Sequence, residues 1–421
     1  MDITDKKIKR SRNLYIIEAA LEYFIAILVS GSFLATITTR LGFSDAHTGI
    51  LSSIISLGSV FQLISIAIRP KRSKPMVVAL SIANQVLFTF LYVIPLPKES
   101  NMFLKMAFIG VILTAYLLYY IAHPKKTNWF MSLVDDKERG RFTANKEIVS
   151  LITGMGISFG MGAVVDYFKA KGDITAALIV CAITMFSLTV LHTLTILFTV
   201  EPETNSKASG NFLKSIVSLA KDKNVLKVSI LFVIWAMANS VTAPFIATYN
   251  LKDLGLSVTT TIVIAAIGSV GRILVSRFWG AYADKNSFAK MDMLCFGVAA
   301  VSFLFIVFSS PKNGIYTMTG YNLLHAVALG GINSSLINLV FDLVPEERRA
   351  DSLAVTQVAS GVSAFLVTLA VSPFVDFVQS NGNKLFGITV YPQQITAVVS
   401  VILTLVAIIY TGKTLVKRKK A

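Results

Sequence analysis

Long runs of apolar residues, separated by short polar segments, recur along the entire chain. A helix needs about 20 apolar residues to cross the hydrocarbon core of a bilayer, and in lipid only helices or closed barrels satisfy the backbone. The runs are far too long for barrel strands, so the pattern predicts an all-α membrane protein. We place twelve transmembrane helices at residues 14–39, 46–68, 76–95, 104–133, 144–168, 174–200, 225–250, 257–279, 289–309, 315–342, 353–377 and 392–412.

The composition agrees with this pattern. Apolar residues make up 54% of the chain, charged residues make up only 15%, and the mean hydropathy is +0.68, whereas a soluble chain carries about 25% charge. The net charge of +16 does not indicate nucleic-acid binding, because most basic residues fall in segments that the topology places in the cytoplasm. We therefore predict a multi-pass protein of a bacterial plasma membrane, with both termini cytoplasmic and basic clusters near anionic lipid head groups.

The second half of the chain repeats features of the first. The sequence L-V-D-D-K-E-R-G-R-F from Leu133 is echoed by L-V-P-E-E-R-R-A-D-S from Leu343, and a shorter echo relates L-G-F-S at 41–44 to L-G-L-S at 254–257. In a membrane protein, parallel repeats of this kind indicate two halves around a central path.

This repeat predicts a bundle of six helices at residues 1–200, a cytoplasmic linker at 201–224 and a second bundle of six helices at 225–421. Pro202 is expected to end the sixth span, because proline cannot continue a helix. The apolar pattern at 211–221 predicts a short amphipathic helix on the inner membrane surface.

The loop between the eighth and ninth spans carries the most specific motif. It reads G-A-Y-A-D-K from Gly280 and is preceded by Arg277, which is similar to the G-x-x-x-D-R/K loop of the major facilitator superfamily. Taken with the spans, the linker and the repeat, the whole chain resembles that superfamily. The resemblance implies two pseudo-symmetric bundles of six helices that transport a substrate by alternating access. It also implies a gate at Asp284, with Gly280 allowing close approach and Arg277 as the ionic partner; the alternative is that these are solvated loop charges.

The first half departs from the family pattern, because Lys74 occupies the position of the acidic motif residue. There we expect Arg139 or Arg141 of the R-G-R loop to form the gate with an acidic residue of the same loop. On the opposite face of the membrane, Asp166 and Asp376 occupy equivalent positions in the repeat. They are candidates for an outer gate, or simple charges at helix ends.

The fourth span is the richest in polar residues. Tyr116, Tyr119, His123 and Lys126 follow a spacing of three to four residues and share one face of a helix. The repeat aligns Lys126 with a residue inside the tenth span, which places it about 10 Å into the membrane at 1.5 Å per residue. Together with Lys125, this face is interpreted as an anion-binding site with aromatic walls, of which Lys126 is the stronger candidate. The alternative is a pair of lysines that snorkel to the inner interface.

The first span contains Glu18 and Glu22, one helical turn apart on one face. Glu22 lies at about the depth expected for Lys126. Two interpretations follow, since a carboxylate at this depth is costly. Glu18 and Glu22 are candidates for proton coupling, with Glu22 as the titrating group. Alternatively, Glu22 is the partner of Lys126 in a buried ion pair, and one pair can serve both roles if substrate competes for the lysine.

The second half offers fewer charges. Its candidates for substrate contact are Arg272, Trp235, Asn239, Asn322 and His325. A guanidinium can bind a carboxylate or phosphate in a bidentate way, so Arg272 is a second anion-binding candidate, with pairing to Asp284 or a backbone carbonyl as its alternative. Lone histidines in spans, such as His325 and His192, are more often satisfied packing groups. Pro244 is expected to break the seventh span.

These patterns favour a transporter over an enzyme, because no phosphate-binding G-x-x-x-x-G-K-[ST] motif and no credible catalytic set appears. We predict a monomeric secondary active transporter for a small organic anion, with the proton as coupling ion and with no cofactor or metal. The alternatives are a neutral sugar or nucleoside permease, a hydrophobic-drug/proton antiporter, and a non-transporting sensor or lipid flippase on the same fold.

Overall fold

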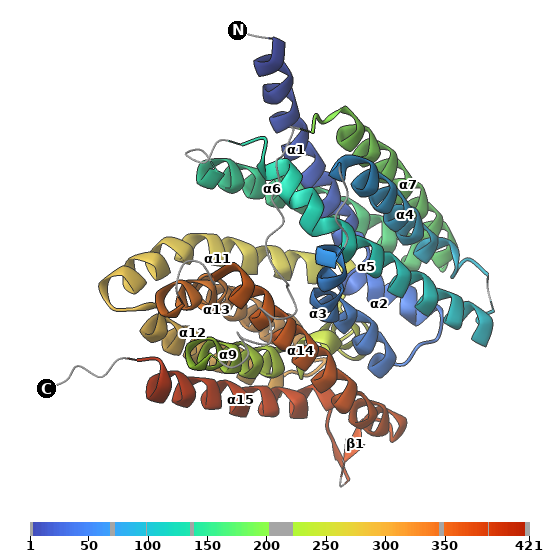
Figure 1. The fold of residues 1–421 in the computed structure, drawn as a ribbon. Helices are drawn as coiled ribbons and strands as arrows, with labels where there is room; N and C mark the ends of the chain where they lie inside the picture. Colours follow the sequence, from blue (N-terminus) through green and yellow to red (C-terminus); the bar gives the residue numbers. More distant parts are fainter. Residues whose placement is uncertain are drawn as a thin grey trace, which may run out of the picture. The chain divides into compact units, whose positions relative to one another are not determined.

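The computed structural model describes residues 3–67, 72–97, 99–134, 139–201, 222–344, 349–385 and 387–416 of the 421-residue chain (Figure 1). This part of the chain is almost entirely helical. Its β structure is one antiparallel hairpin, in which β1 (Lys384–Leu385) pairs with β2 (Ile388–Thr389). The amphipathic helix predicted at 211–221 lies outside the described residues.

The chain divides into two compact units. The first unit comprises Met1–Ser44 and Gly58–Lys207, and the second comprises Asp45–Leu57 and Ala208–Ala421. Helix α3 (Asp45–Ala67) therefore contributes its first turns to the second unit and its remainder to the first. The arrangement of two bundles of six helices joined by a linker remains a prediction.

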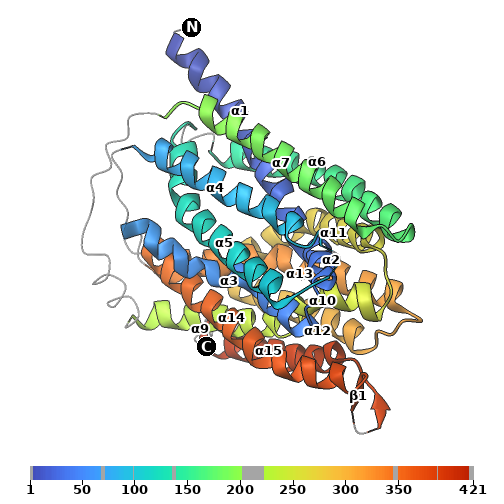
Figure 2. The same ribbon diagram turned by 90° about the vertical axis from the view of Figure 1, so that its right-hand side faces the viewer.

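Long helices build the first unit. They are α1 (Ile3–Leu28), α2 (Gly31–Arg40), α4 (Ser73–Val93), α5 (Met102–Met131), α6 (Arg139–Ala170) and α7 (Ile174–Phe198). Helix α4 packs against both α5 and α7, and α1 packs against α6 and α7 (Figure 2). The side chain of Asp173 caps α7 by accepting a hydrogen bond from the backbone amide of Ala176 at 3.0 Å, which satisfies one of the amides that a helix start leaves unpaired.

The second unit contains, besides the first turns of α3, a run of short and long helices. They are α9 (Lys223–Ser240), η1 (Ala243–Phe245), α10 (Ile246–Thr248), η2 (Tyr249–Asp253), α11 (Val258–Lys285), α12 (Phe288–Val307), α13 (Gly314–Leu343), α14 (Arg349–Ser380) and α15 (Pro392–Thr414). Helix α12 packs against α13 and α15, and its buried face joins an apolar cluster that includes Trp235, Trp279 and Phe296.

Within the described residues, ten helices are long and apolar enough to cross a membrane, or eleven if the bent pair α1 and α2 counts as one span. A helix or a broken helix covers each of the twelve ranges expected from the sequence, but twelve crossings remain a prediction. Many apolar side chains point outward, among them Ile183 (61% exposed), Phe186 (57%) and Ile402 (55%). Such surfaces are unfavourable in water, and they fit a multi-pass membrane protein.

Two of the predicted spans are interrupted. Helices α1 and α2 meet at a bend of 40°, where Gly31 adopts a φ of +52° that favours glycine. The seventh span breaks after Ser240, and Pro244 lies in the short 3₁₀ helix η1, as expected from the sequence. The same span then widens into the π-helix η2, the type of irregularity that is frequent at functional sites.

Candidate functional site

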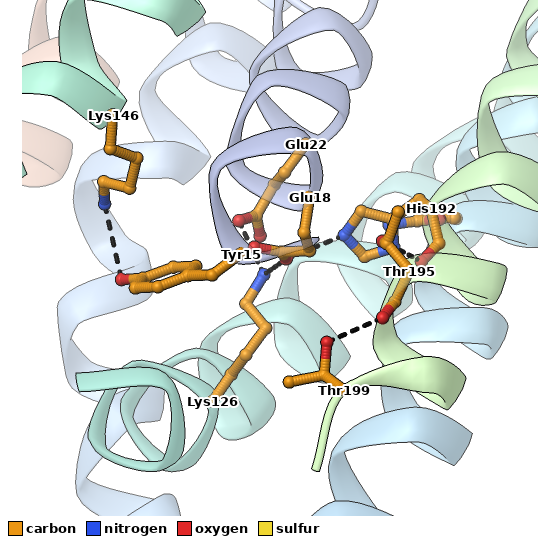
Figure 3. Close-up of polar contacts among 9 residues, drawn as sticks. Tyr15, Glu18, Glu22, Lys126, Lys146, His192, Thr195 and Thr199 are labelled. Atoms are coloured by element: carbon orange, nitrogen blue, oxygen red, sulfur yellow. Dashed lines mark hydrogen bonds and ion pairs between the residues drawn. The ribbon is translucent and has the colours of Figure 1, made fainter. Parts of the chain in front are cut away.

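A buried ion cluster lies in the first unit, where α1 faces α5 (Figure 3). The ammonium Nζ of Lys126 is 2.7 Å from Oε1 of Glu18 and 2.6 Å from Oε2 of Glu22. The Lys126 and Glu18 side chains are 5% and 1% exposed, whereas Glu22 is 22% exposed. The spacing of four residues places both carboxylates on one face of α1, so a single lysine can bridge them. Only Glu22 can be reached from outside the cluster.

Helix α7 extends the cluster through His192. Its Nε2 lies 2.9 Å from Oε1 of Glu18, and its Nδ1 lies 2.7 Å from Nε2 of Gln85 on α4. When the Gln85 amide donates to Nδ1, the Nε2–H of the ring is the donor to Glu18. Glu18 therefore has two donors in a site closed to solvent, which is what a buried carboxylate requires.

Two threonines lie near this histidine without joining the cluster, Thr195 on α7 and Thr199 directly after its end. The hydroxyl of Thr195 donates to the His192 carbonyl and that of Thr199 donates to the Thr195 carbonyl, both at 2.7 Å (Figure 3). Because these hydroxyls bond their own helix, the contribution of α7 to the cluster is His192.

A pocket of about 350 Å³ opens beside Glu22. Its polar lining comprises Glu22, Tyr23, Tyr119, Lys146 and Ser150. The Nζ of Lys146 lies 3.5 Å from the hydroxyl of Tyr15 and 5.0 Å from the centre of its ring. Lys146 was missed from the sequence, because a single lysine near the start of α6 resembles an ordinary charge at the membrane interface. Glu22 thus lines the pocket and is paired with the buried Lys126, while Lys146 lines the same pocket.

The cluster also contains ligand atoms that suit a cation. One atom each from Glu18, Glu22 and His192 lie within 4.8 Å of one another, and carboxylate oxygen with imidazole nitrogen is a common donor set for divalent metals. However, the Lys126 ammonium contacts both carboxylates. The lysine therefore supplies the positive charge that a metal ion would otherwise bring.

The other predicted residues of the fourth span line up along α5. Tyr119 lies 5.2 Å from the ring of His123, and the buried Tyr116 packs at 5.1 Å against Phe88. Lys125 is half-buried. The structure thus joins Lys126 to the acidic residues and Tyr119 to the pocket, while Tyr116 belongs to the packed interior.

In the second unit, the structure brings two of the predicted residues together and leaves the other three apart. Trp235 and His325 lie together, with ring centres 6.1 Å apart. Asn322 donates to the Met318 carbonyl of its own helix at 2.9 Å. Arg272 is exposed and, among the residues that the structure describes, has no ion-pair partner. Asn239 leaves its buried Oδ1 without a hydrogen-bond partner. Their roles in substrate binding remain predictions.

The predicted gates are described only in part. The side chains of Arg139, Arg141, Arg277 and Asp284 lie outside the described part of the chain. An added Cβ at Gly280 would meet no atom of the described residues within 4 Å. Asp166 lies near the end of α6 and Asp376 near the end of α14, as the repeat predicts, and their gating role also stays a prediction.

The second unit contains a charged cluster that sequence reasoning missed. Asp45, which is 2% exposed, accepts hydrogen bonds from Lys252 Nζ at 2.5 Å and from Gln379 Nε2 at 2.7 Å. A signal for it was present, because Asp45 directly follows the L-G-F-S echo at 41–44, and Lys252 lies just before the matching L-G-L-S. The echo by itself indicates a duplication and does not indicate which side chains meet.

Helices that cross a membrane, together with a pocket beside a buried ion cluster, define a membrane transporter rather than an enzyme. The chain belongs to the Major Facilitator Superfamily, which it matches over residues 19–368. Its substrate is accordingly a small molecule.

Several solved transporters share the fold. The nucleoside transporter NupG superposes with a TM-score of 0.73 at 14% identity, covering 95% of this chain and 98% of NupG. The POT family transporter PepTSo gives 0.72 at 13% identity, covering 96% and 98%. A bacterial homologue of the iron transporter ferroportin, in an inward-facing state, gives 0.70 at 14% identity, covering 98% and 99%. A search of the curated proteins found no match. At these identities the likeness shows the fold alone.

Proposed function

We propose that this protein is a secondary active transporter that moves a small organic anion across the plasma membrane by alternating access, with the proton as coupling ion. The observation that carries the proposal is the position of Glu22. This carboxylate contacts the buried Lys126 at 2.6 Å and also lines the pocket. A substrate carboxylate in the pocket could therefore replace Glu22 as a partner of Lys126.

The proposed coupling is an exchange of carboxylates on Lys126. An ammonium has three donors, and the Lys126 ammonium has two carboxylate partners. When Glu22 takes up a proton, its charge is lost and its hold on the lysine weakens. A carboxylate of the substrate can then take its place, while Glu18, anchored also by His192, keeps Lys126 in position.

Charge balance supports this exchange. Glu18 and Glu22 carry two negative charges, and Lys126 and Lys146 carry two positive charges, so the site is neutral when empty. Adding one proton to Glu22 together with one monovalent anion returns the same net charge. Uncompensated charge in a membrane interior costs several kcal/mol, so the loaded and empty states are both accessible, whereas a state with the anion alone is not.

A second candidate is a neutral polar solute such as a sugar or nucleoside. The pocket also presents the hydroxyl groups of Tyr119 and Ser150, which bind uncharged polar groups. A solute of this kind would leave the ion pair between Glu22 and Lys126 closed, so the two candidates differ in their dependence on Glu22.

The test uses the full chain in liposomes, with a panel of small carboxylates, sugars and nucleosides as solutes. We expect a carboxylate to accumulate when a pH gradient is imposed. Glu22→Gln should abolish that accumulation yet retain exchange of labelled for unlabelled solute, because a neutral side chain mimics protonated Glu22. Glu99→Gln, an exposed position outside the helices, is the matched control and should behave as wild type.

Two results would refute the proposal. Unchanged uphill accumulation in Glu22→Gln excludes this residue as the coupling site. Transport of a sugar or nucleoside without any carboxylate favours the neutral solute, and then Lys126 is a structural cation.

A further inference from the structure

Among the described carboxylates of the second unit, Asp292 is buried with neither oxygen hydrogen-bonded. Asp292 lies in the second turn of α12 and is 0% exposed. Neither of its oxygens has a hydrogen-bond partner. The neighbouring hydroxyl of Ser335 on α13 donates instead to the Phe288 carbonyl at 3.1 Å. Buried polar groups are nearly always paired in folded proteins, so this exception needs an explanation.

The surroundings of Asp292 are apolar. Its helix contributes Met291, Cys295 and Phe296, each 0% exposed, to the cluster that also contains Leu336 of α13 and Ala407 of α15. Helix α12 packs against α11, α13 and α15. Among the described side chains of these four helices, the titratable or polar groups that interact with Asp292 are the Cys295 thiol and the Ser335 hydroxyl. No described lysine, arginine or histidine pairs with it.

An ionised carboxylate in this setting would have no counterion among the described residues, and the one hydroxyl beside it, that of Ser335, donates to the Phe288 carbonyl. Its desolvation alone costs several kcal/mol, and the penalty disappears when a proton neutralises the group. We infer that Asp292 is a second proton-binding site of this protein, which holds its proton in the conformation described and releases it when a change of conformation admits water. The site requires neither Glu22 nor an anionic substrate, so it stands or falls independently of the proposed function.

The first test asks whether the proton is present. Infrared spectra of the purified full-length protein should contain a carboxylic-acid C=O band that is missing from Asp292→Asn. Asp342→Asn, at an exposed position on α13, is the matched control and should keep the band. If Asp292→Asn does not fold, labelling the aspartates of the wild type with ¹³C should shift the same band. A spectrum in which neither Asp292→Asn nor the label alters an acid band would show that Asp292 is ionised, and would overturn the inference.

The second test asks whether the proton exchanges. In D₂O the band should shift as the carboxyl deuterates in the native protein, because a site that releases its proton must meet water in some conformation. A band that persists unshifted until the protein unfolds would reduce Asp292 to a permanently neutral packing residue and would also overturn the inference. Neither measurement needs a transported solute.

Discussion

The two units each bury a histidine, and the two surroundings are opposite. His192 bonds a carboxylate on one side and an amide on the other. His325 lies among aromatic rings, with Tyr321 at 5.1 Å and Phe303 at 5.3 Å, and its polar neighbour is Ser302, whose hydroxyl is 3.4 Å away. Charge pairing dominates the first site and aromatic packing dominates the second.

This difference shows that two units built from similar apolar helices can bury their polar side chains in unlike surroundings. A repeat preserves the spacing of apolar faces, because every helix must bury one face and present another to lipid. The few polar positions inside the helices are not fixed by this requirement and can differ between the units. In the first unit the cluster of Glu18, Lys126 and His192 is linked throughout. In the described part of the second unit Asp45 is paired, whereas Asp292 has no ion-pair or hydrogen-bond partner. The asymmetry can be tested by removing one member from each site.

The largest effect is expected for Lys126→Met. This change leaves Glu18 and Glu22 facing each other without a cation, and breaking a buried ion pair from one side costs about 3 to 5 kcal/mol. The thermal midpoint of the purified protein should fall steeply, and transport should be lost. Lys125→Met, one position earlier and half-buried, should be far milder.

A double variant separates charge from packing. Adding Glu22→Gln to Lys126→Met removes one of the two unpaired carboxylates, so part of the lost stability should return. If the double variant is as unstable as the sum of the single changes, the lysine acts through packing and the charge argument fails.

The two histidines should respond unequally to leucine. His192→Leu removes a hydrogen bond to a charged group, which is worth about 1.5 to 3 kcal/mol. His325→Leu replaces one apolar-packed ring by another apolar side chain and should cost about 1 kcal/mol, mainly in lost ring contacts. Chemical unfolding of both variants measures the difference. Equal losses of unfolding free energy in the two variants would show that His192 and His325 do not differ in the way that their surroundings suggest.

A smaller loss is expected for Asp45→Asn. The ion pair with Lys252 disappears, but the amide oxygen can still accept from Gln379. Because Lys252 is 31% exposed, solvent screens the pair, and we expect about 1 kcal/mol or less. Added salt should reduce the difference between wild type and variant. A loss as large as that of Lys126→Met would place the dominant charge cluster in the second unit.

The smallest effect on stability is expected for Arg272→Ala. The side chain is exposed and without an ion-pair partner in the described structure, so the folded state should change by less than about 0.5 kcal/mol. Transport of an anion should nevertheless be abolished if the predicted binding role is right. Full transport activity with unchanged stability would remove Arg272 from the site.

The sequence predicts only part of this difference between the two units. Apolar periodicity located the spans, and the spacing of four residues placed Glu18 and Glu22 on one face. The repeat argument set the depth of Lys126, and the ion pair with Glu22 was one of two interpretations. Periodicity assigns a side chain to a face of its own helix, but it does not tell which helix lies opposite.

The remaining partners depend on tertiary packing. His192 is 174 residues from Glu18 along the chain, and Gln85 is 107 residues from His192. Read alone, His192 resembled a packing group, and it became part of the network only when α7 was placed against α1. The bend between α1 and α2 was missed for a related reason, because Gly31 within an apolar run does not by itself interrupt a helix.

The wide turn at Tyr249–Asp253 has a consequence for how this protein tolerates insertions and deletions. A π-helical turn holds one residue more than an α-helical turn, so this segment carries a spare residue. Deleting one residue there could be absorbed by ordinary α-helical bonding without shortening the span. Each residue of an α-helix turns the chain by about 100°, however, so the deletion would swing Lys252 away from Asp45. The span would keep its length, and the second unit would lose the ion pair between Lys252 and Asp45.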